Sequence, residues 1–422
     1  MSPPPSLSSV ASSLLASQGL QLQSLKVFQS LWAGYGQICH VTASPNSSLN
    51  SSAETSRSAS TTNSNVSTPQ EVQSFILKLI TPPPTKSNDE GHLRKILSYQ
   101  VEQYFYSELA PRLPSSIPVA NCHSSINQHH TDGTSTTAMM LNDLRQRYPV
   151  AGEKRAQLTQ PQVHAALDWL SGFHGSWWPQ VKGMDRRSFV RPPLDEANLD
   201  SKDGRGKGVW LNGGYTYLAT RRREYDALAS DPDSEWNKPL TEPLEDTLSL
   251  SEIVADVLAP RAWGWSPTEE YQTLIHGDVK SENLFTSVSG EEVAFYDFQY
   301  VGLGLGVCDL AKLFTCSVPL GLLVTSSGTG FGQELAMQSG EKALLKRYIV
   351  RLKEVSRKEY DWSVFVKHWE TALVDWLRFQ ASWGFWGNTE WLEARVRWIL
   401  KDKTWREEVV GGWKAGQRSM EV

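Results

Sequence analysis

Three residues in the second half of the chain have types and spacing that could do chemistry together. The motif His276-x-Asp278-x4-Asn283 is followed by Asp297, which ends the apolar run VAFYDF. An aspartate on a loop can accept or orient a hydroxyl proton. An amide oxygen farther along that loop and a carboxylate at the end of a neighbouring strand can bind one metal ion, and Mg²⁺ prefers such oxygens and bridges nucleotide phosphates. Phosphoryl transfer needs little beyond positioning and charge neutralisation, so the spacing predicts this reaction.

Two charged residues earlier in the chain could complete a nucleotide site. Lys78 interrupts the apolar strand-like segment 74–80, and Glu102 lies within the helical spacing of residues 91–109. In isolation, Lys78 is better explained as an edge-strand lysine whose stem covers apolar surface. With the motif downstream, an ion pair with Glu102 is the better explanation, because a buried lysine needs such a partner. The alternative for Glu102 is a solvated helix residue.

In their order along the chain, these motifs resemble those of the ecdysteroid kinase-like family. This family belongs to the protein-kinase-like superfamily of aminoglycoside phosphotransferases and choline kinases. The shared pattern is a lysine strand ending near PPP, a helix of the type SYxVExxFY, the loop HGDVKSENLF and the metal motif DFQ. The resemblance extends roughly from Leu25 to Trp386, and the ordered set is more specific than any single motif.

The resemblance implies a catalytic or metal-binding role for each matching residue of the loop. Asp278 would orient or deprotonate the acceptor hydroxyl. Lys280 resembles the Ser/Thr-kinase lysine that neutralises the transferred phosphate, which keeps a protein substrate open. Asn283 and Asp297 would bind Mg²⁺.

The resemblance also implies nucleotide-binding roles in the first part of the chain. Lys78 would hold the α- and β-phosphates of ATP, with Glu102 as its ion-pair partner. Gly34 and Gly36 would belong to the hairpin that covers the phosphates.

Four further residues receive roles from the same resemblance. Backbone groups around Met140 and Asn142 would meet adenine where two lobes join. His276 and Asp309 would brace the catalytic loop.

We expect a bilobal protein-kinase-like α+β fold. It would have a small antiparallel-sheet N-lobe and a mostly helical C-lobe that carries the catalytic and metal-binding loops. The expected parts are a flexible N-terminal tail (1–19), the N-lobe (20–141) with a disordered Ser/Thr-rich insertion (44–68), and the C-lobe (142–422).

Local patterns give further expectations. Apolar runs predict strands over 31–42 and 74–80, and the polar composition of 121–135 predicts a loop. Helical periodicity predicts helices over 91–109, 161–174, 341–357 and 361–383. Gly302, Gly304 and Gly306 lack GxGxxG spacing and predict a flexible turn. His174 would form a hydrogen bond at a helix end, and Arg221–Arg223 would either line the acceptor cleft or form a solvated face.

Composition excludes several classes of protein. Of 422 residues, 41 are Lys or Arg and 46 are Asp or Glu, so the net charge is 41 − 46 = −5, which disfavours a nucleic-acid binder. No apolar run is long enough for a membrane helix. The N-terminus lacks the basic region of a secretory signal, and the four cysteines form no CxxC pair. We therefore expect a cytoplasmic protein with reduced thiols, as a monomer or a weak homodimer.

The function expected from these motifs is ATP-dependent, Mg²⁺-assisted phosphorylation of a hydroxyl group on a small organic acceptor. A protein Ser/Thr kinase is an alternative, but Asp297-Phe-Gln replaces Asp-Phe-Gly and no Ala-Pro-Glu follows. A nucleotide-binding pseudokinase without turnover and a non-enzymatic scaffold are the others. A cationic acceptor would need carboxylates and Trp faces near Asp278, whereas a steroid would need an apolar slot, and the sequence does not decide between them.

Overall fold

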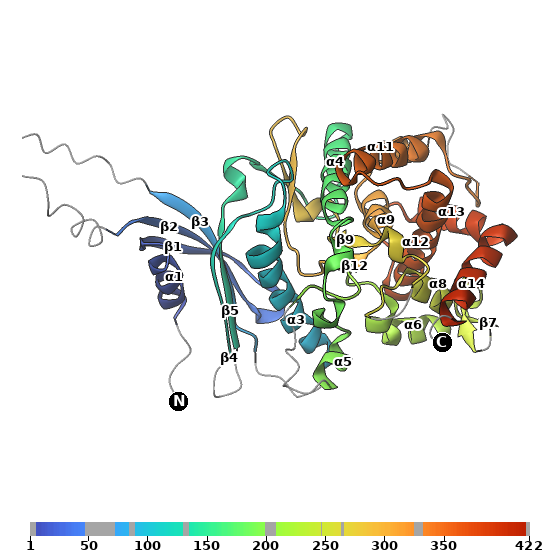
Figure 1. The fold of residues 1–422 in the computed structure, drawn as a ribbon, viewed down its shortest axis with the longest axis horizontal. Coiled ribbons are helices and arrows are strands. Elements are labelled where there is room, and N and C mark those ends of the chain that lie inside the picture. The colour runs from blue at the N-terminus through green and yellow to red at the C-terminus, as the bar shows by residue number, and fades with distance from the viewer. Residues whose placement is uncertain are drawn as a thin grey trace, which may run out of the picture. The chain divides into compact units, whose positions relative to one another are not determined.

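The computed structural model describes residues 6–46, 72–83, 89–129, 135–198, 208–245, 247–262, 266–324 and 332–418. The chain divides into two compact units (Figure 1). Unit 1 comprises residues 1–112 and 120–144, and unit 2 comprises residues 113–119 and 145–422. Unit 1 is built on an antiparallel sheet and unit 2 is mostly helical, so the predicted α+β protein-kinase-like fold class is confirmed.

Unit 1 is organised around a five-stranded sheet in the order β1-β2-β3-β5-β4, with every neighbouring pair antiparallel. The strands are β1 (Leu20–Ser30), β2 (Gly36–Pro45), β3 (Gln73–Ile80), β4 (Cys122–His129) and β5 (Ser135–Asn142). Because side chains alternate between the two faces of a strand, neighbouring residues of β3 serve different faces. Leu77 and Leu79 belong to the apolar core on one face of the sheet, so Lys78, which lies between them, is on the opposite face.

Helix α1 (Leu7–Ala16) contradicts the prediction of a flexible tail over residues 1–19. Its buried residues Val10, Ala11, Leu14 and Leu15 pack into the core formed by β2, β3 and β5. The side chain of Ser6 accepts a hydrogen bond from the backbone of Ser9 and caps the helix. The Ser- and Ala-rich composition suggested disorder, but the apolar residues recur at helical spacing and bury one face.

Both edge strands of this sheet depart from the predictions. β1 was not predicted, and the strand expected over 31–42 is β2, which begins at Gly36 after a short 3-10 turn. The loop predicted over 121–135 is largely β4. Edge strands keep one side in contact with solvent, so their polar residues conceal the strand pattern.

The predicted Ser/Thr-rich insertion is described only at its start. β2 continues through Pro45, and residues 47–68 lie outside the described residues. β3 and helix α3 (Glu90–Tyr104) match the predicted strand over 74–80 and most of the predicted helix over 91–109. The end of that helix, 105–109, is a π-helical turn.

Unit 2 contains most of the helices, and α4 and α11 pack against each other (Figure 1). The helices are α4 (Gln160–Trp177), α5 (Pro193–Asn198), α6 (Arg222–Ala229), α7 (Asn237–Thr241), α8 (Leu250–Leu258), α9 (Gly306–Cys316), α10 (Leu320–Leu323), α11 (Ser339–Ser356), α12 (Trp362–Trp383), α13 (Thr389–Lys401) and α14 (Lys403–Arg418). The helices predicted over 161–174, 341–357 and 361–383 are therefore confirmed. None of the helices among the described residues combines the length and apolar character that crossing a membrane requires.

Short strands of unit 2 frame its central loops. They are β6 (Val150–Ala151), β7 (Pro243–Glu245), β8 (Leu248–Ser249), β9 (Thr273–Ile275), β10 (Leu284–Thr286), β11 (Val293–Phe295) and β12 (Gly302–Gly304). β9 pairs with β12, β10 pairs with β11 and β6, and β7 pairs with β8.

Strand β12 shows that the flexible turn predicted at Gly302 and Gly304 is wrong. The glycines there allow close packing: a Cβ on Gly302 would lie 2.3 Å from the carbonyl oxygen of Trp210. Such an approach excludes any larger residue.

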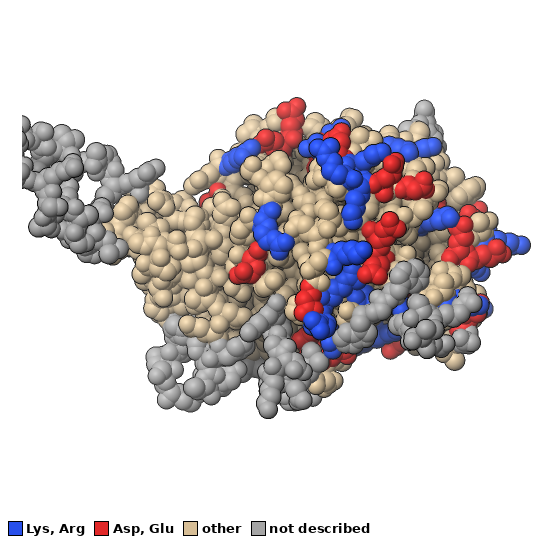
Figure 2. All heavy atoms as spheres, in the orientation of Figure 1, with Lys and Arg blue, Asp and Glu red and all other residues tan. Residues whose placement is uncertain are grey.

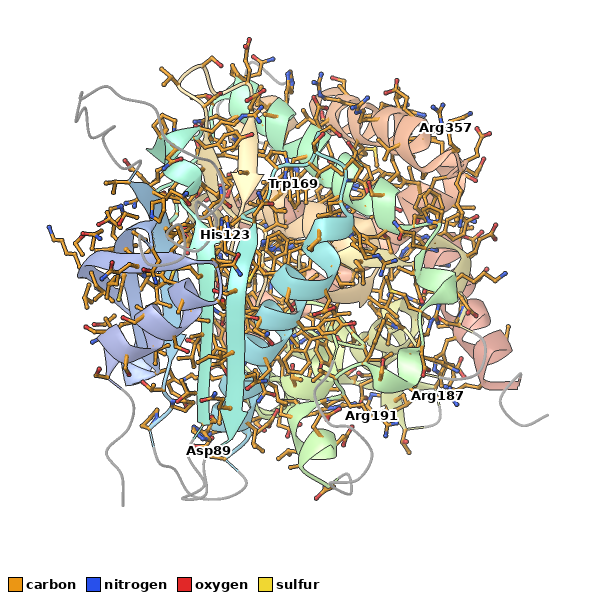
Figure 3. All side chains as sticks on the ribbon, turned by 60° about the vertical axis from the view of Figure 1, so that its left-hand side comes forward. Asp89, His123, Trp169, Arg187, Arg191 and Arg357 are labelled. Carbon is orange, nitrogen blue, oxygen red and sulfur yellow. The ribbon has the colours of Figure 1, made fainter. Side chains whose placement is uncertain are left out.

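Aromatic side chains fill much of the core of unit 2. Trp169 of α4, labelled in Figure 3, stacks on Phe173 with ring centroids 5.0 Å apart. Its indole N–H donates to the carbonyl of Pro118 at 2.9 Å. On the face of unit 2 in Figure 2, positive and negative side chains are interspersed. All four cysteines are free thiols, as predicted.

Candidate active site

The catalytic motif lies on the loop between β9 and β10 in unit 2. Pairing of β10 with β11 continues past the strands, because the backbone N–H of Tyr296 donates to the carbonyl of Asn283 at 3.0 Å. Asn283 and Asp297 therefore lie at the same end of one hairpin. This confirms the expected layout, in which a loop residue and the end of a neighbouring strand are brought together.

Asp309 of α9 holds the start of this loop. Its Oδ2 accepts from the backbone N–H of His276 at 2.7 Å, and its Oδ1 accepts from that of Gly277 at 2.9 Å. Burial raises the pKa of this carboxyl, but the hydrogen bond from His174 and the nearby positive charges outweigh burial, and the pKa lies below its usual value. A charged acceptor that binds two backbone donors fixes the loop geometry, so the predicted bracing contact is present.

The His174 ring extends the brace to α11. Its Nε2 lies 3.2 Å from Oδ2 of Asp309, and its Nδ1 lies 2.8 Å from the hydroxyl of Tyr348. His174 lies in the last turn of α4 and has no exposed surface. The hydrogen-bonding role predicted for His174 is confirmed, and its partner is the residue that orders the catalytic loop.

The His276 ring bridges two parts of the site. Its Nδ1 accepts from the backbone N–H of Asp278 at 3.3 Å, and its Nε2 lies 2.9 Å from the carbonyl oxygen of Tyr296. The two contacts together require a neutral ring with the proton on Nε2. Burial lowers the pKa of His276, which is consistent with that neutral form.

Lys280 lies beside the proposed catalytic carboxylate. Its Nζ is 3.1 Å from Oδ2 of Asp278 and 3.4 Å from Oε1 of Glu282. Burial lowers the pKa of the Lys280 ammonium, but the two carboxylates outweigh burial and raise the pKa above its usual value. Lys280 is therefore a permanent cation beside Asp278.

Asn283 fixes the same carboxylate from the other end of the loop. Its Nδ2 donates to the backbone carbonyl of Asp278 at 2.8 Å and to Oδ2 of that residue at 3.0 Å. Because both bonds use the nitrogen, the carboxamide oxygen is the atom that could bind a metal ion.

Asp297 has an unusual backbone conformation. Its φ is 66°, in the left-handed region, and its Oδ1 accepts from Nε2 of Gln299 at 2.6 Å. Such strain in a residue other than glycine recurs at functional sites. No group of three or more His, Cys, Asp and Glu side chains in the described ranges could enclose a metal. The donor set fits Mg²⁺, which takes one or two protein oxygens and completes its shell with phosphates and water.

In unit 1, Lys78 and Glu102 form the predicted ion pair. The Nζ of Lys78 lies 2.6 Å from Oε2 of Glu102, and both side chains are buried. Lys78 lies on β3 between Ile38 and Met139 of the neighbouring strands, and its Nζ also lies 5.4 Å from the ring centroid of Tyr99. The edge-strand explanation of Lys78 and the solvated explanation of Glu102 are therefore wrong. Contact with phosphates stays a prediction.

Gly34 lies in the connection between β1 and β2 and Gly36 is the first residue of β2, so both lie at the turn of a hairpin, as predicted. Gly34 has a φ of 75°, and nothing lies within 4 Å of the position a Cβ would take. Gly36 has a φ of 152°, and its Cβ would lie 2.0 Å from the carbonyl oxygen of Leu79. Both positions favour glycine for backbone reasons, and a role over nucleotide phosphates stays a prediction.

Met140 and Asn142 lie on the last strand of unit 1. Met140 has partners on both sides, Leu77 and Ser124, and Asn142 ends the strand with its Oδ1 2.5 Å from the backbone N of Asn121. Unit 1 ends at residue 144, close to the boundary expected after 141. Contact of these residues with adenine stays a prediction.

A pocket of about 160 Å³ opens beside Asp278 within unit 2. Four aromatic side chains line it: Tyr215, Trp376, Trp383 and Trp386. The sequence did not assign these residues to the site, because they lie far from the catalytic loop in the chain and have helix or loop spacing typical of a core.

Arg221 supports this aromatic wall from behind. Its guanidinium lies 5.2 Å from the ring centroid of Trp383, and its Nε donates to the carbonyl of Tyr215 at 2.7 Å. Arg221 is buried, whereas Arg222 and Arg223 are exposed. Arg222 and Arg223 therefore match the solvated-face explanation, whereas none of the three arginines is among the residues that line this pocket.

A model of one protein family matches most of the described catalytic region of this chain. The model of the ecdysteroid kinase-like family matches residues 53–326, which is more than half of the 422 residues. The chain belongs to the ecdysteroid kinase-like family. The predicted family is confirmed, and with it the small-molecule kinase class of function. A search of curated proteins gave no match to this ecdysteroid kinase-like chain.

Several solved structures align with most of this ecdysteroid kinase-like chain at low sequence identity. A macrolide 2'-phosphotransferase from Brachybacterium faecium has 10% identity and a TM-score of 0.40, with 96% of each chain covered. A choline kinase from Cryptosporidium parvum has 11% identity and a TM-score of 0.38, with 94% of this chain and 89% of that chain covered. A choline kinase from Streptococcus pneumoniae has 11% identity and a TM-score of 0.37, with 96% and 98% covered.

Proposed function

We propose that this chain transfers the γ-phosphoryl group of ATP to a hydroxyl group of a small organic acceptor bound in the pocket beside Asp278. The observation that carries the proposal is the environment of Asp278. This carboxylate lines a pocket, is oriented by Asn283 and lies beside a permanent cation, Lys280. These are the parts that phosphoryl transfer to an alcohol requires.

In the proposed reaction, Asp278 orients the acceptor hydroxyl and accepts its proton. The hydroxyl oxygen forms a bond to the γ-phosphorus while the bond from phosphorus to the β,γ-bridging oxygen breaks, which releases ADP. Lys280 neutralises negative charge on the transferred group, because its ammonium stays protonated. The brace from Asp309 keeps Asp278 at a fixed position, so little reorganisation is needed during reaction.

Mg²⁺, when bound with ATP, would neutralise phosphate charge and align the phosphates. The oxygens of Asn283 and Asp297 are the groups of unit 2 suited to hold it. In unit 1, the Lys78 ammonium would bind the α- and β-phosphates while Glu102 holds it in place.

The proposal is tested by incubating the full chain with Mg·ATP labelled at the γ-phosphate and a pooled small-molecule extract. We expect the label on a small organic product that survives removal of protein. Label on protein instead would favour a protein kinase. Mg²⁺-dependent ATP binding without any transfer would favour a pseudokinase, and the absence of such binding would contradict the whole account.

A further inference from the structure

The pocket beside Asp278 has an excess of positive charge. Its cationic side chains are Lys154, Arg155, Lys280 and Lys312, and its carboxylates are Asp278 and Glu282. Both carboxylates already lie within ion-pair distance of Lys280. The remaining three cations therefore have no carboxylate of the pocket wall to neutralise them.

Lys312 is the most unusual of these cations. Its side chain is buried, its Nζ donates to the carbonyl of Gly277 at 2.6 Å, and it lies 5.6 Å from the ring centroid of Tyr215. Among the residues that the structure describes, it forms no ion pair. The Asp309 carboxylate acts electrostatically on this ammonium, but its oxygens already accept two backbone N–H bonds and contact His174. An ammonium has three donors, so a ligand oxyanion at Lys312 would add an acceptor that this carboxylate does not supply.

A second donor of the same wall lacks an acceptor. Trp376 of α12 lines the pocket, and its Nε1 is buried without a hydrogen-bond partner in the described part of the chain. The neighbouring Trp386 differs, because its Nε1 donates to Sγ of Cys316 at 3.2 Å. Lys312 and Trp376 also line a second cavity of about 40 Å³, whose one carboxylate, Asp375, is paired with Arg378. Donors without acceptors favour a ligand that brings oxygen atoms.

The aromatic residues set the shape of such a ligand. Trp383 is 56% exposed and offers an indole surface to the pocket. Aromatic faces alone would also attract a cation. Here a cationic acceptor would meet the buried Lys312 and the exposed Lys154 and Arg155, which form no ion pair in the described part of the chain. Repulsion therefore opposes a cation, whereas an anion gains from the same charges.

On the basis of the proposed function, we infer that the acceptor is an anionic hydroxyl compound with a flat apolar body. Its carboxylate, sulfate or phosphate group binds at Lys312 and Trp376, its flat body lies against the tryptophans, and its hydroxyl reaches Asp278. Quaternary ammonium and amino-sugar acceptors do not fit this charge pattern.

Three matched probes test the inference by binding alone. They are 4-(hydroxymethyl)benzoate, 4-(hydroxymethyl)benzamide and 4-(hydroxymethyl)phenyl-trimethylammonium, titrated into the full chain without nucleotide and followed by calorimetry. The carboxylate is expected to bind about tenfold more tightly than the amide, because its oxygens accept from the Lys312 ammonium as charged groups whereas the amide oxygen is neutral. The ammonium probe is expected to bind more weakly than the amide.

Two variants test whether Lys312 and Trp376 cause the preference for the carboxylate probe. Lys312→Met and Trp376→Phe are each expected to reduce the preference for the carboxylate while leaving the affinity for Mg·ATP unchanged. Lys358→Met and Trp391→Phe are the matched controls. Lys358 lies over the ring of Trp178, outside this pocket, and Trp391 of α13 has a buried Nε1 with no hydrogen-bond partner among the described residues. Both controls are expected to keep the preference. Should Lys312→Met fail to fold, Trp376→Phe still tests the binding site of the ligand's anionic group.

Tighter binding of the ammonium probe, equal binding of all three probes, or no binding of any of them would overturn the inference. So would a preference that survives in Lys312→Met and Trp376→Phe. Because the readout is binding, a wild-type chain that prefers the carboxylate but never phosphorylates an acceptor would refute the proposed function and leave the anion preference standing.

Discussion

The Nζ of Lys280 lies 3.1 Å from Oδ2 of Asp278, two residues earlier in the same loop. The contact places a cation at the carboxylate that would accept the hydroxyl proton. It also ties the two side chains together, so that a change in Lys280 alters the charge around Asp278 without removing that residue.

Replacing Lys280 by Met is expected to lower kcat by about 10²–10³, the usual cost of removing one group that stabilises developing charge. Steady-state kinetics with the identified acceptor measure kcat. Lys401→Met, at an exposed ion pair with Glu334, is the control and should keep wild-type kinetics. An unchanged kcat in Lys280→Met would show that the cation plays no part in transfer.

Replacing Glu102 by Gln should weaken unit 1 and its nucleotide binding together. Removing one partner leaves the buried ammonium of Lys78 without its carboxylate, so we expect a loss of about 3 kcal/mol in the free energy of unfolding. Urea unfolding and ATP titration report the two effects. Glu108→Gln, at an exposed position of the following turn, should behave as wild type. Wild-type stability in Glu102→Gln would mean that the pair is not buried in solution.

Replacing Asp309 by Asn should reduce kcat although Asp309 does not line the acceptor pocket. The carboxamide has one acceptor oxygen in place of two, so one of the backbone N–H groups of His276 and Gly277 loses its bond. A buried unsatisfied donor costs about 1–3 kcal/mol. Thermal unfolding and kcat should fall together, with the KM for ATP nearly unchanged. The exposed Asp231→Asn is the control. A large rise in KM with normal kcat would contradict a positioning role.

His368 of α12 should make unit 2 sensitive to acid. Burial lowers the pKa of this ring from 6.5 to about 4, where it contacts Tyr360 and Tyr271. In the unfolded chain the ring takes up a proton near its ordinary pKa, so the unfolded state binds more protons between these values. Stability from the neutral ring is therefore complete above about pH 6.5 and falls as the pH drops toward about 4, by about 3 kcal/mol in total.

The variant His368→Gln isolates this contribution. Its free energy of unfolding should fall less than that of wild type between about pH 7 and about pH 4. Urea unfolding at a series of pH values measures both curves. Parallel curves would show that His368 titrates normally in the folded protein.

The sequence could predict the catalytic loop because its chemistry is local. Asp278, Lys280 and Asn283 lie within one short segment, and residue types at that spacing leave few other functions. The Lys78–Glu102 pair was predicted only because the catalytic motif lies downstream, since the strand alone favoured an edge-strand lysine. Helix α1 was not predicted, because its Ser- and Ala-rich composition is typical of a disordered tail. The spacing of its apolar residues is helical, and their packing against the sheet stabilises the helix.

The acceptor pocket could not be predicted in the same way. Tyr215 comes from a loop and the tryptophans from α12 and the segment after it, and only the fold brings them beside Asp278. The buried position of Lys312 depends on the contact between α9 and the loop at Gly277. Such groups carry no sequence signal of their own, because a lysine on a helix is usually solvated.

The most direct test of the account compares wild type with Asp278→Asn in transfer of labelled phosphate from Mg·ATP to the acceptor. Both proteins should bind Mg·ATP with similar affinity, and the variant should transfer about 10²–10⁴ times more slowly, the usual contribution of a general base. Equal transfer rates in the two proteins would contradict the assignment of Asp278, and with it the proposed mechanism.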